Sequence, residues 1–472
     1  MSSMSGDFFR DVFGFSEGEY VETRRLLEFH ARFKQDDDLA TFGAPAEHCE
    51  FVDLPSPTKT SSTTEPSDRT TTTTAAGSAV VDAGVFSTPS VQELRDQAVK
   101  DFSTFRTQHP DVLESLQKEY HPSREGHAIR IVNVKGEARG LHHDAANLNA
   151  TIQAASQFNY LEFPGPGVTP ERGISGYIFD RTQGPACAIA CAAGTAYRNY
   201  LVRMPGRVLR GQTHDAQLNG MADVEQRLRD AVEADPSFAP LPSTVPSVAV
   251  DHSGDVASTV GQQSSGSSFF TVRNGYVEST MVDLKRLNAL IAAKPSLVAE
   301  LESRLRIGVQ ADTAVTDPQA GKTYVRDAAT GKWTWASPPP SASGASSSVF
   351  RVTQTYNSAL SVGYSRVQGG DIWGPMARLV LRATYEATLL AGAINTMRHA
   401  KARPPGTLIG RLPPVLLTKV GGGVFGNDAF WIRDAIREGA DRVGRLCPGL
   451  PLDVRIVHYG GVEDGYEEAF PE

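Results

Sequence analysis

The strongest constraint on the fold is a series of strand patterns that alternates with helix patterns from residue 129 onward. Ile129–Val134 (IRIVNV) predicts a strand, and Val415–Val420 and Leu452–Tyr459 predict two more near the end of the chain. Helical patterns of about 10 to 25 residues separate such strands, which favours βαβ connections and a mainly parallel sheet. We therefore predict an α/β fold in which helices cover both faces of a mixed sheet.

The other predicted elements complete this alternation. Further strands are expected at Phe158–Phe163, Arg306–Val309 and within Val349–Ser365, and helices at Ala145–Ser156, Ala186–Tyr200, Val282–Leu305, Ile372–His399 and Ala429–Leu446. Composition then divides the chain into an N-terminal helical segment (1–54), a disordered Thr/Ser-rich linker (55–83) and one domain (84–465) with a helical lead-in (84–125) and flexible insertions (241–268 and 327–348). In the lead-in, Ser90 and Glu93 have the spacing of a capping box.

The bulk composition argues against several classes of protein. The formal net charge is −8, whereas proteins that bind nucleic acid broadly carry a basic face. The four cysteines are scattered, which is typical of a reducing compartment rather than of a disulfide framework. The first residues lack the apolar core of a signal peptide, and no apolar run reaches the length of a membrane span. We therefore expect a soluble, cytoplasmic protein, and the sequence leaves its oligomeric state open.

The stretch TKVGGGVFGND (418–428) is the clearest functional motif. It lies between a predicted strand and a helix that begins after Asn427 or Asp428, either of which can serve as the N-cap. Its glycines let the backbone approach a phosphate closely, and the N-terminus of the helix favours an anion. The motif predicts a turn that binds a diphosphate; the alternative is a tight turn that needs glycine only for its geometry. The predicted ligand-binding residues are Gly421, Gly422, Gly423, Val424, Phe425, Gly426 and Asn427.

The same stretch fits the Gly-x-Gly-x-x-Gly pattern of nicotinamide enzymes, but its position opposes that interpretation. The dinucleotide-binding arrangement needs an acidic residue about 20 residues further on and more βαβ units after the motif. Here the last predicted strand ends at Tyr459, shortly before the final residue, Glu472. The motif therefore belongs to the last βαβ unit. It also lacks the Gly-Lys-Ser/Thr of a Walker A loop.

These elements together resemble one family. The strand VLLTKV, the turn GGGVFGN, the helix AFWIRDAI and the strand DVRIVHY look like the end of a macrodomain, an α/β module that binds ADP-ribose. The upstream segment FNYLEFPGPG…GISGYIFDRTQGPACAIACAAGTAYRNY resembles the divergent branch near poly(ADP-ribose) glycohydrolases and bacterial-effector-type ADP-ribosyl hydrolases. The resemblance covers roughly residues 129–200 and 306–460. It implies a macrodomain-like three-layer fold, ADP-ribose and ADP-ribosylated protein as partners, and Tyr459 close to the adenine or the adjacent sugar.

The Asn-Ala-Ala-Asn turn and the Gln-Glu-Glu catalytic signature of these families are absent, so the catalytic candidates come from chemistry. Hydrolysis at the C1″ carbon of the ribose passes through a cation-like transition state, and a carboxylate can stabilise it and activate water. Asp180, in the turn DRTQGP before a helix, is the first candidate. Asp312 is the second, because it follows the predicted strand RIGVQ at the edge where open α/β sheets place ligands. Asp371, ahead of a long helix, is the third. Capping a helix or a turn is the alternative role for all three, and Glu386, within that helix, is expected at the surface or behind the site.

Further ligand contacts are predicted in the upstream segment. Phe158 and Tyr160 would stack on adenine at the end of a strand, and Glu162 would accept a hydrogen bond from the amine of the base. The alternative is that the two rings belong to the core. Three residues, Thr182, Gln183 and Gly184, offer hydrogen bonds beside Asp180.

No cluster of residues predicts a metal ion or a cofactor. His142, His143 and Asp144 are adjacent and therefore point apart, and Cys187 and Cys191 share a helix face without a second pair of ligands. The sequence leaves three functions: a hydrolase that removes ADP-ribose from protein side chains, with arginine-linked ADP-ribose as one candidate; a module that binds ADP-ribose without cleaving it; and, as the weaker alternative, an NAD-dependent oxidoreductase.

Overall fold

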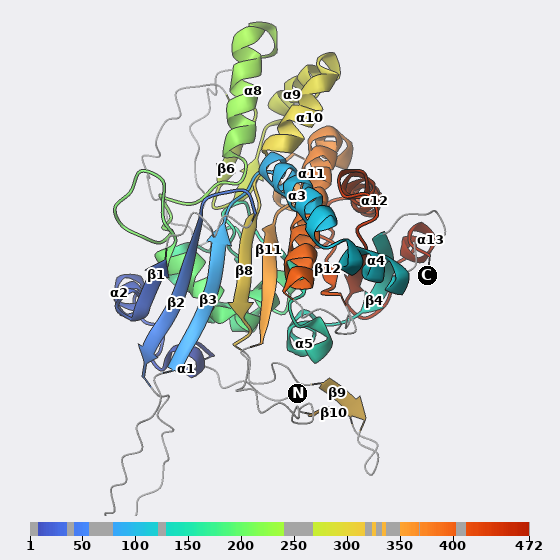
Figure 1. Ribbon diagram of the computed structural model, residues 1–472. Coiled ribbons are helices and arrows are strands. Elements are labelled where there is room, and N and C mark those ends of the chain that lie inside the picture. The colour runs from blue at the N-terminus through green and yellow to red at the C-terminus, as the bar shows by residue number, and fades with distance from the viewer. Residues whose placement is uncertain are drawn as a thin grey trace, which may run out of the picture.

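The structure is a computed structural model, and it describes residues 8–34, 42–55, 79–120, 129–239, 268–316, 323–326, 333–336, 350–367, 369–402 and 412–471. Within these ranges, nine strands form one sheet in the order β1-β2-β3-β8-β11-β5-β12-β13-β4 (Figure 1). The strands from β11 to β4 in this order are parallel, and each pair among β1, β2, β3, β8 and β11 is antiparallel. The bounds are β1 Ala31–Lys34, β2 Ala46–Leu54, β3 Ala79–Ser87, β4 Ile129–Lys135, β5 Thr151–Ala155, β8 Gly308–Ala314, β11 Arg351–Asn357, β12 Val415–Leu417 and β13 Leu452–His458.

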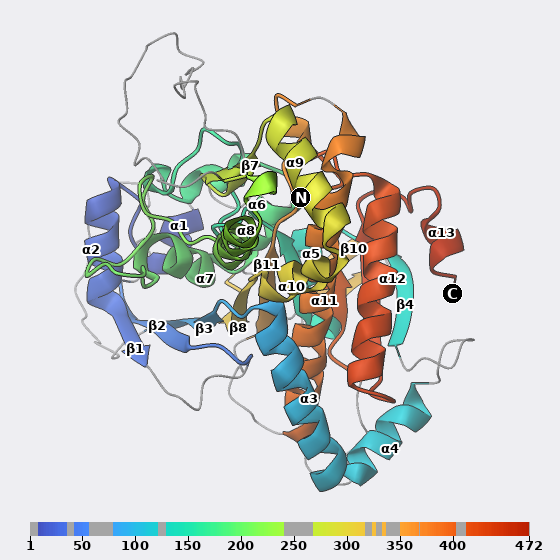
Figure 2. The ribbon, with the colours of Figure 1, turned by 90° about the horizontal axis from the view of Figure 1, so that it is seen from above.

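Helices cover both faces of this sheet, which makes a three-layer α/β fold (Figure 2). One face carries α3 (Val91–Gln108), α4 (Pro110–Glu119), α8 (Ala222–Ala234), α9 (Met281–Ala293), α10 (Pro295–Arg304), α11 (Gly370–Lys401) and α12 (Ala429–Leu446). The other carries α1 (Phe8–Phe13), α2 (Tyr20–His30), α6 (Gln183–Ala190), α7 (Ala192–Ala196) and the π-helical turn η5 (Tyr197–Leu201). Shorter elements are α5 (Ala138–His143), α13 (Tyr466–Ala469), and the hairpins β6 (Thr271–Arg273) to β7 (Tyr276–Glu278) and β9 (Thr323–Arg326) to β10 (Trp333–Ala336).

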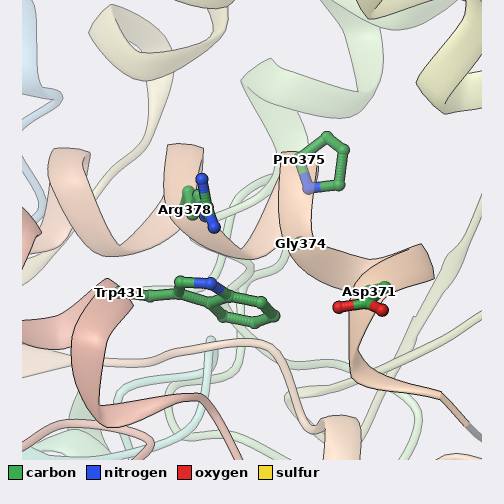
Figure 3. A pocket seen from close by; sticks show the side chains of 5 residues that line it. All are labelled: Asp371, Gly374, Pro375, Arg378 and Trp431. Carbon is green, nitrogen blue, oxygen red and sulfur yellow. The ribbon is translucent and has the colours of Figure 1, made fainter.

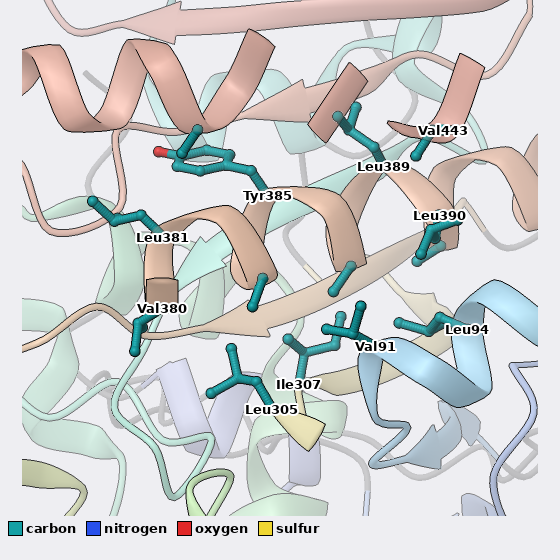
Figure 4. Packing of buried hydrophobic residues seen from close by; sticks show 14 of the residues in the cluster. Val91, Leu94, Leu305, Ile307, Val380, Leu381, Tyr385, Leu389, Leu390 and Val443 are labelled. Carbon is teal, nitrogen blue, oxygen red and sulfur yellow. The ribbon is translucent and has the colours of Figure 1, made fainter. Parts of the chain in front are cut away.

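The core has two parts, one on each face of the sheet. Neighbouring residues of a strand point to opposite faces, and accordingly Val415 and Leu417 belong to one buried cluster and Leu416 to the other. Helix α11 lies at the centre of the larger part, where Leu389 and Leu390 pack among residues of α3 and α12 (Figure 4). The predicted α/β class with helices on both faces is confirmed, and so is the capping box, in which Ser90 and Glu93 bond to one another's backbone N–H.

The N-terminal region differs from the prediction. Residues 1–54 are not only helical, because β1 and β2 follow α1 and α2 and extend the large sheet. Strand β3 begins at Ala79, inside the predicted linker 55–83, and the part of that linker from 56 to 78 lies outside the described residues. The N-terminal segment is therefore part of the same folded unit. Most of the predicted insertions also lie outside the described residues, but β10 forms within 327–348.

Two predictions around β5 are wrong. Ala145–Ser156 is not a helix: a short 3₁₀ turn (Ala145–Asn147) precedes β5. Strand β5 lies between β11 and β12 and is buried on both faces, so it lacks the alternation of polar and apolar residues that marks a half-exposed strand. Phe158–Phe163 is not a strand but a tight turn. The Gln157 N–H donates to the Leu161 carbonyl at 2.9 Å, and Tyr160 has a φ of 63°.

Candidate functional site

The loops that follow the parallel strands meet at one edge of the sheet. Strands β5, β11, β12 and β13 all run in the same direction, so the segments after Ala155, Asn357, Leu417 and His458 emerge together. Ligands of open α/β sheets bind at this carboxyl edge. The glycine-rich stretch after β12, here called the glycine turn (residues 418–428), lies at this edge.

The glycine turn is folded tightly by its own backbone. The Asn427 N–H donates to the Gly421 carbonyl at 2.9 Å, and the Gly426 N–H donates to the Gly423 carbonyl at 2.9 Å. Gly421 has a φ of 81°, and a Cβ on it would lie 2.5 Å from the Ala359 Cβ, so this position requires glycine. Part of the glycine pattern therefore serves the geometry of the turn, as the structural alternative predicts.

The tip of the turn has a different character. Among the described residues, the backbone N–H groups of Gly423, Val424 and Phe425 have no protein acceptor. Gly423 is exposed, and a Cβ on it would meet no atom within 4 Å. Consecutive free N–H groups are the donors that phosphate oxygens need, and Gly423 presents one of them without a side chain. The tip therefore has the chemistry of an anion site that is made of backbone N–H groups rather than of charged side chains.

Buried side chains hold the turn from below. The Tyr385 hydroxyl donates to the Thr418 carbonyl at 2.8 Å and accepts from the Val420 N–H at 3.0 Å. The Asn427 side-chain amide donates to the Leu360 carbonyl at 2.8 Å. Asn427 was predicted to contact the ligand, but it is buried and fixes the turn to the loop after β11. Its own Oδ1 has no partner in the described residues.

The N-terminus of α12 is already capped by a side chain. Asp428 is the N-cap, and its carboxylate accepts from the Phe430 N–H at 2.7 Å. Because the Asp428 carboxylate already accepts a hydrogen bond from a free N–H of the first helical turn, a bound phosphate would contact the tip of the glycine turn rather than the helix N-terminus. The prediction that the helix dipole attracts the ligand is therefore weakened by this residue.

Three aromatic rings connect the glycine turn to two other loops. The Tyr364 ring lies 5.7 Å from the Phe425 ring at 87°, and the Tyr276 ring lies 5.5 Å from each of them. The Gly363 N–H also donates to the Phe425 carbonyl at 2.8 Å. Edge-to-face contacts of this kind contribute about 0.5–1.5 kcal/mol beyond the buried area. The turn after β11 and the β6–β7 hairpin are thereby fixed against the glycine turn.

The charge of Asp180 acts on this aromatic group. Burial raises the pKa of Tyr364, and the charge of Asp180 raises it further, so the carboxylate is within electrostatic reach of that hydroxyl. The pKa of Tyr276 is raised by burial first and then by Tyr364 and Asp180. Asp180 itself accepts from the Thr182 N–H at 2.7 Å and from the Thr182 hydroxyl at 2.6 Å. The N-cap residue of α6 is Thr182, without a side-chain cap bond, so Asp180 does not cap this helix as the alternative predicted. Its two bonds to Thr182 instead fix a partly exposed carboxylate in the turn before the helix.

Exposed apolar side chains gather on the same loops. Phe179 precedes Asp180, Val424 is at the tip of the glycine turn, and Tyr459 follows β13; they are 86%, 64% and 79% exposed. Tyr364 and Phe430 are also exposed. Large apolar side chains left in water on several loops of one edge are typical of a surface that binds a ligand or partner. Tyr459 thus has the exposure that its predicted role requires.

Asp371 lines a separate small pocket. The pocket has a volume of about 240 Å³ and is formed by Asp371, Gly374, Pro375 and Arg378 of α11 and Trp431 of α12 (Figure 3). The Arg378 guanidinium lies 5.4 Å from the centre of the Trp431 ring. Trp431 is in the first turn of α12, immediately after the glycine turn, so the pocket that contains Asp371 lies next to the start of this helix.

The structure places Asp312 away from the glycine turn. Strand β8 runs antiparallel to β11, so Asp312 lies near Arg351 at the amino edge of the parallel strands, opposite the glycine turn. It has a φ of 53° within an irregular part of the β8–β11 pairing. Its carboxylate pairs with the Arg398 guanidinium, with Oδ1 accepting at 2.8 Å. The prediction required β8 to run parallel to the neighbouring strand β11, whereas it runs antiparallel.

The structure also places Phe158, Tyr160 and Glu162 in the interior rather than at the surface of the site. Both rings are buried in the core, as the alternative predicted, and Glu162 is fully buried. The Glu162 carboxylate accepts from Arg198 at 3.0 and 3.1 Å, and Arg198 lies 3.5 Å from the centre of the Tyr356 ring. Burial raises the pKa of Glu162 to about 7 against the opposing effect of Arg198. This ion pair belongs to the interior.

Gln183 and Gly184 have structural roles, because both contact the backbone of β5. Gln183 accepts from the Ala155 N–H at 2.7 Å and donates to the Gln153 carbonyl at 2.7 Å, so its side chain completes the hydrogen bonding at the end of β5. Gly184 is buried directly against the Ala155 carbonyl. Of the predicted group, only Thr182 stays beside Asp180. Glu386, expected at the surface or behind the site, is buried away from it and pairs with Arg95 and Arg442.

Residues that the sequence argument did not select also belong to this edge. The sequence patterns do not single out Phe179, Tyr276 and Phe430, whereas Tyr364, together with Ser358 and Ser361, is expected from the sequence to line the ribose side of the site. Their signal was available in part, because Tyr364 and Phe430 follow β11 and β12 and are therefore on loops at the ligand edge. The contribution of Tyr276 required knowledge of how a hairpin far along the chain packs.

The protein is therefore an α/β protein whose glycine turn, at the carboxyl edge of the parallel strands, is a candidate anion-binding site. None of the family models, curated proteins or solved structures compared with the chain matches it. In the part of the chain that the structure describes, no three His, Cys, Asp or Glu side chains are grouped to hold a metal ion. No helix in those ranges has the length and apolar character needed to cross a membrane.

Proposed function

We propose that this protein binds ADP-ribose through the glycine turn and hydrolyses the bond between ADP-ribose and a modified protein side chain. The observation that carries the proposal is the tip of the turn, where three successive backbone N–H groups are free at the carboxyl edge of a parallel sheet. The resemblance of this stretch to the end of a macrodomain supports a diphosphate as the ligand. We place the activity in the cytoplasm, with ADP-ribosylated proteins as substrates.

Asp180 is the proposed catalytic carboxylate. The Phe425 ring packs on Tyr364, and the charge of Asp180 acts on the Tyr364 hydroxyl. We infer that a ligand whose diphosphate lies on the tip extends its ribose toward this carboxylate. Asp180 would accept a proton from water as the oxygen attacks C1″, and the bond from C1″ to the side chain would break as the leaving group takes up a proton. Asp180→Asn keeps the shape and removes the base.

A module that binds ADP-ribose without cleaving it is the second candidate. One observation favours it: the Asp180 Oδ1 atom already accepts two hydrogen bonds from Thr182, so this oxygen is occupied by its neighbour. In addition, Asp312 lies at the opposite edge and cannot assist. Wild-type protein that binds ADP-ribose but releases none from any linkage would establish this candidate.

Two measurements test the proposal. Calorimetry with ADP-ribose, NAD, AMP and ribose phosphate identifies the ligand, and we expect ADP-ribose to bind most tightly. Absence of heat with ADP-ribose would remove the central claim, and preferential binding of NAD with hydride transfer would favour an oxidoreductase. Release of ADP-ribose from modified proteins is then compared for wild type and Asp180→Asn. We expect a fall in kcat of about a hundredfold or more, the usual contribution of a general base.

A further inference from the structure

The N-terminal segment reaches the loop that carries Asp180. Glu17 lies between α1 and α2, and its carboxylate accepts from the Ile174 N–H at 2.8 Å and from the Ser175 N–H at 2.6 Å. These two N–H groups begin the 3₁₀ turn η4 (Ser175–Phe179), which leads directly into Asp180. One side chain from the start of the chain therefore bonds to the backbone of the loop more than 150 residues away.

Other contacts fix Glu17 itself. The Tyr200 hydroxyl donates to the Glu17 Oε1 atom at 2.6 Å, and the Tyr200 ring stacks on Tyr20 with 4.9 Å between centroids. The Tyr20 hydroxyl bonds to the Asn199 and Gln212 carbonyls, which anchors the start of α2. Gly173 has a φ of 73°, and a Cβ there would lie 2.6 Å from the Glu17 carboxyl, so the loop leaves room for this group. The carboxylate is held by three donors at once.

The rest of the segment is docked firmly. Phe8, Phe9 and Phe13 of α1 are fully or almost fully buried in the core on this face. In contrast, Phe179 at the other end of the loop is 86% exposed, and Asp180 bonds mainly to its neighbour Thr182. The loop thus has a fixed beginning and an exposed end, and Glu17 supplies the contact at the fixed beginning.

We propose that Glu17 is a positioning residue, through which the N-terminal segment sets the place of the loop that carries Asp180. The inference rests on the proposed function, since it assigns Asp180 a role in the reaction. A charge-assisted contact to consecutive N–H groups restrains a loop more strongly than neutral hydrogen bonds do. Small displacements of a catalytic group have large effects on rate, so the contact matters for turnover more than for ligand affinity at the glycine turn.

The test uses the full chain with Glu17→Gln and, as a matched control, Glu19→Gln, an exposed glutamate without a side-chain cap bond. Hydrogen exchange of peptides that cover 174–182 reports on the loop directly. Release of ADP-ribose gives kcat, and calorimetry gives the dissociation constant of ADP-ribose. Tyr200→Phe removes one donor from the same carboxylate and keeps the ring stack, so it should produce a smaller change of the same kind.

For Glu17→Gln we expect faster exchange over 174–182, a fall in kcat of about ten- to a hundredfold, and an unchanged dissociation constant. Glu19→Gln should match wild type in all three. Unchanged exchange, or faster exchange with unchanged kcat, overturns the proposal. Wild-type protein that releases no ADP-ribose overturns the proposed function instead, and the exchange comparison then decides whether Glu17 fixes the loop.

Discussion

The Tyr385 hydroxyl accepts from the backbone N–H of Val420 at 3.0 Å and so links the central helix α11 to the entry of the glycine turn. The same hydroxyl donates to the Thr418 carbonyl at 2.8 Å, and the Tyr385 ring is fully buried (Figure 4). The Tyr385 hydroxyl oxygen therefore bonds to the backbone of both residues that flank Lys419, namely Thr418 and Val420. Contacts from within the core therefore help to set the conformation of the turn.

Tyr385→Phe should weaken both the protein and the site. The ring stays, but the buried Val420 N–H loses its acceptor, which costs about 1–3 kcal/mol. We expect the free energy of unfolding in urea to fall by that amount and the dissociation constant of ADP-ribose to rise severalfold. Tyr356→Phe is the control, because it removes a buried hydroxyl bonded to Gln354 without touching the turn. Equal effects of both variants on affinity would refute the role of Tyr385.

Asp312→Asn should leave the chemistry intact. Asparagine tolerates the positive φ of this position, and the ion pair with Arg398 lies at the edge opposite the glycine turn. Both partners are about 30% exposed, so the loss of stability should be about 1 kcal/mol or less. Release of ADP-ribose and its affinity should equal those of wild type. A loss of release comparable to that of Asp180→Asn would show that our placement of the site is wrong.

Asp82 predicts a dependence of stability on pH. Burial alone would raise the pKa of Asp82, but hydrogen bonds from His48 and the Gly84 N–H and the charge of Arg351 lower it on balance. A carboxyl whose pKa is lowered by folding stabilises the protein above its unfolded value, and this stabilisation is lost as pH falls through the folded value. Thermal unfolding should therefore separate wild type from Asp82→Asn at pH 7, and the difference should shrink below about pH 4. A difference independent of pH would contradict this assignment.

The Glu162–Arg198 pair should behave as a structural ion pair. Both side chains are fully buried, so Glu162→Gln leaves an uncompensated guanidinium and should cost about 3–5 kcal/mol in urea unfolding. The double variant Glu162→Gln/Arg198→Met removes both charges and should recover part of that loss. If Glu162→Gln instead kept full stability and weakened ADP-ribose binding, Glu162 would be a ligand contact as first predicted.

The parts of the fold that periodicity predicts well are the long, one-sided elements. Helix α12 has the predicted bounds, Ala429–Leu446, because its apolar residues follow a single stripe between a clear N-cap and the last turn. Strand β5 and the turn after it could not be predicted, since their pattern depends on partners on both faces. Gln153 illustrates this: a polar residue in a central strand, it is buried because it bonds to Thr388 and to the Thr418 N–H.

The candidate site likewise has one part that the sequence predicts and other parts that depend on the tertiary structure. The glycine turn is a local feature of the chain, and its position after a strand and before a helix was predicted from the sequence. The assignment of Asp312 needed the direction of β8, which is a property of the whole sheet. The contact of Glu17 with the Asp180 loop joins residues 158 positions apart in the chain, and no local pattern indicates it.

The most direct test of the account is calorimetry of ADP-ribose with wild type and Gly423→Ala. A Cβ at Gly423 meets no protein atom within 4 Å, so the variant should fold with unchanged stability while its methyl group obstructs the phosphate. We predict that wild type binds ADP-ribose and that Gly423→Ala loses affinity by about tenfold or more, equivalent to about 1.4 kcal/mol. Gly165→Ala, at another glycine with open space around it, should bind like wild type. Equal affinity of Gly423→Ala and wild type, or no binding by wild type, would contradict the claim that the tip of the glycine turn holds the diphosphate.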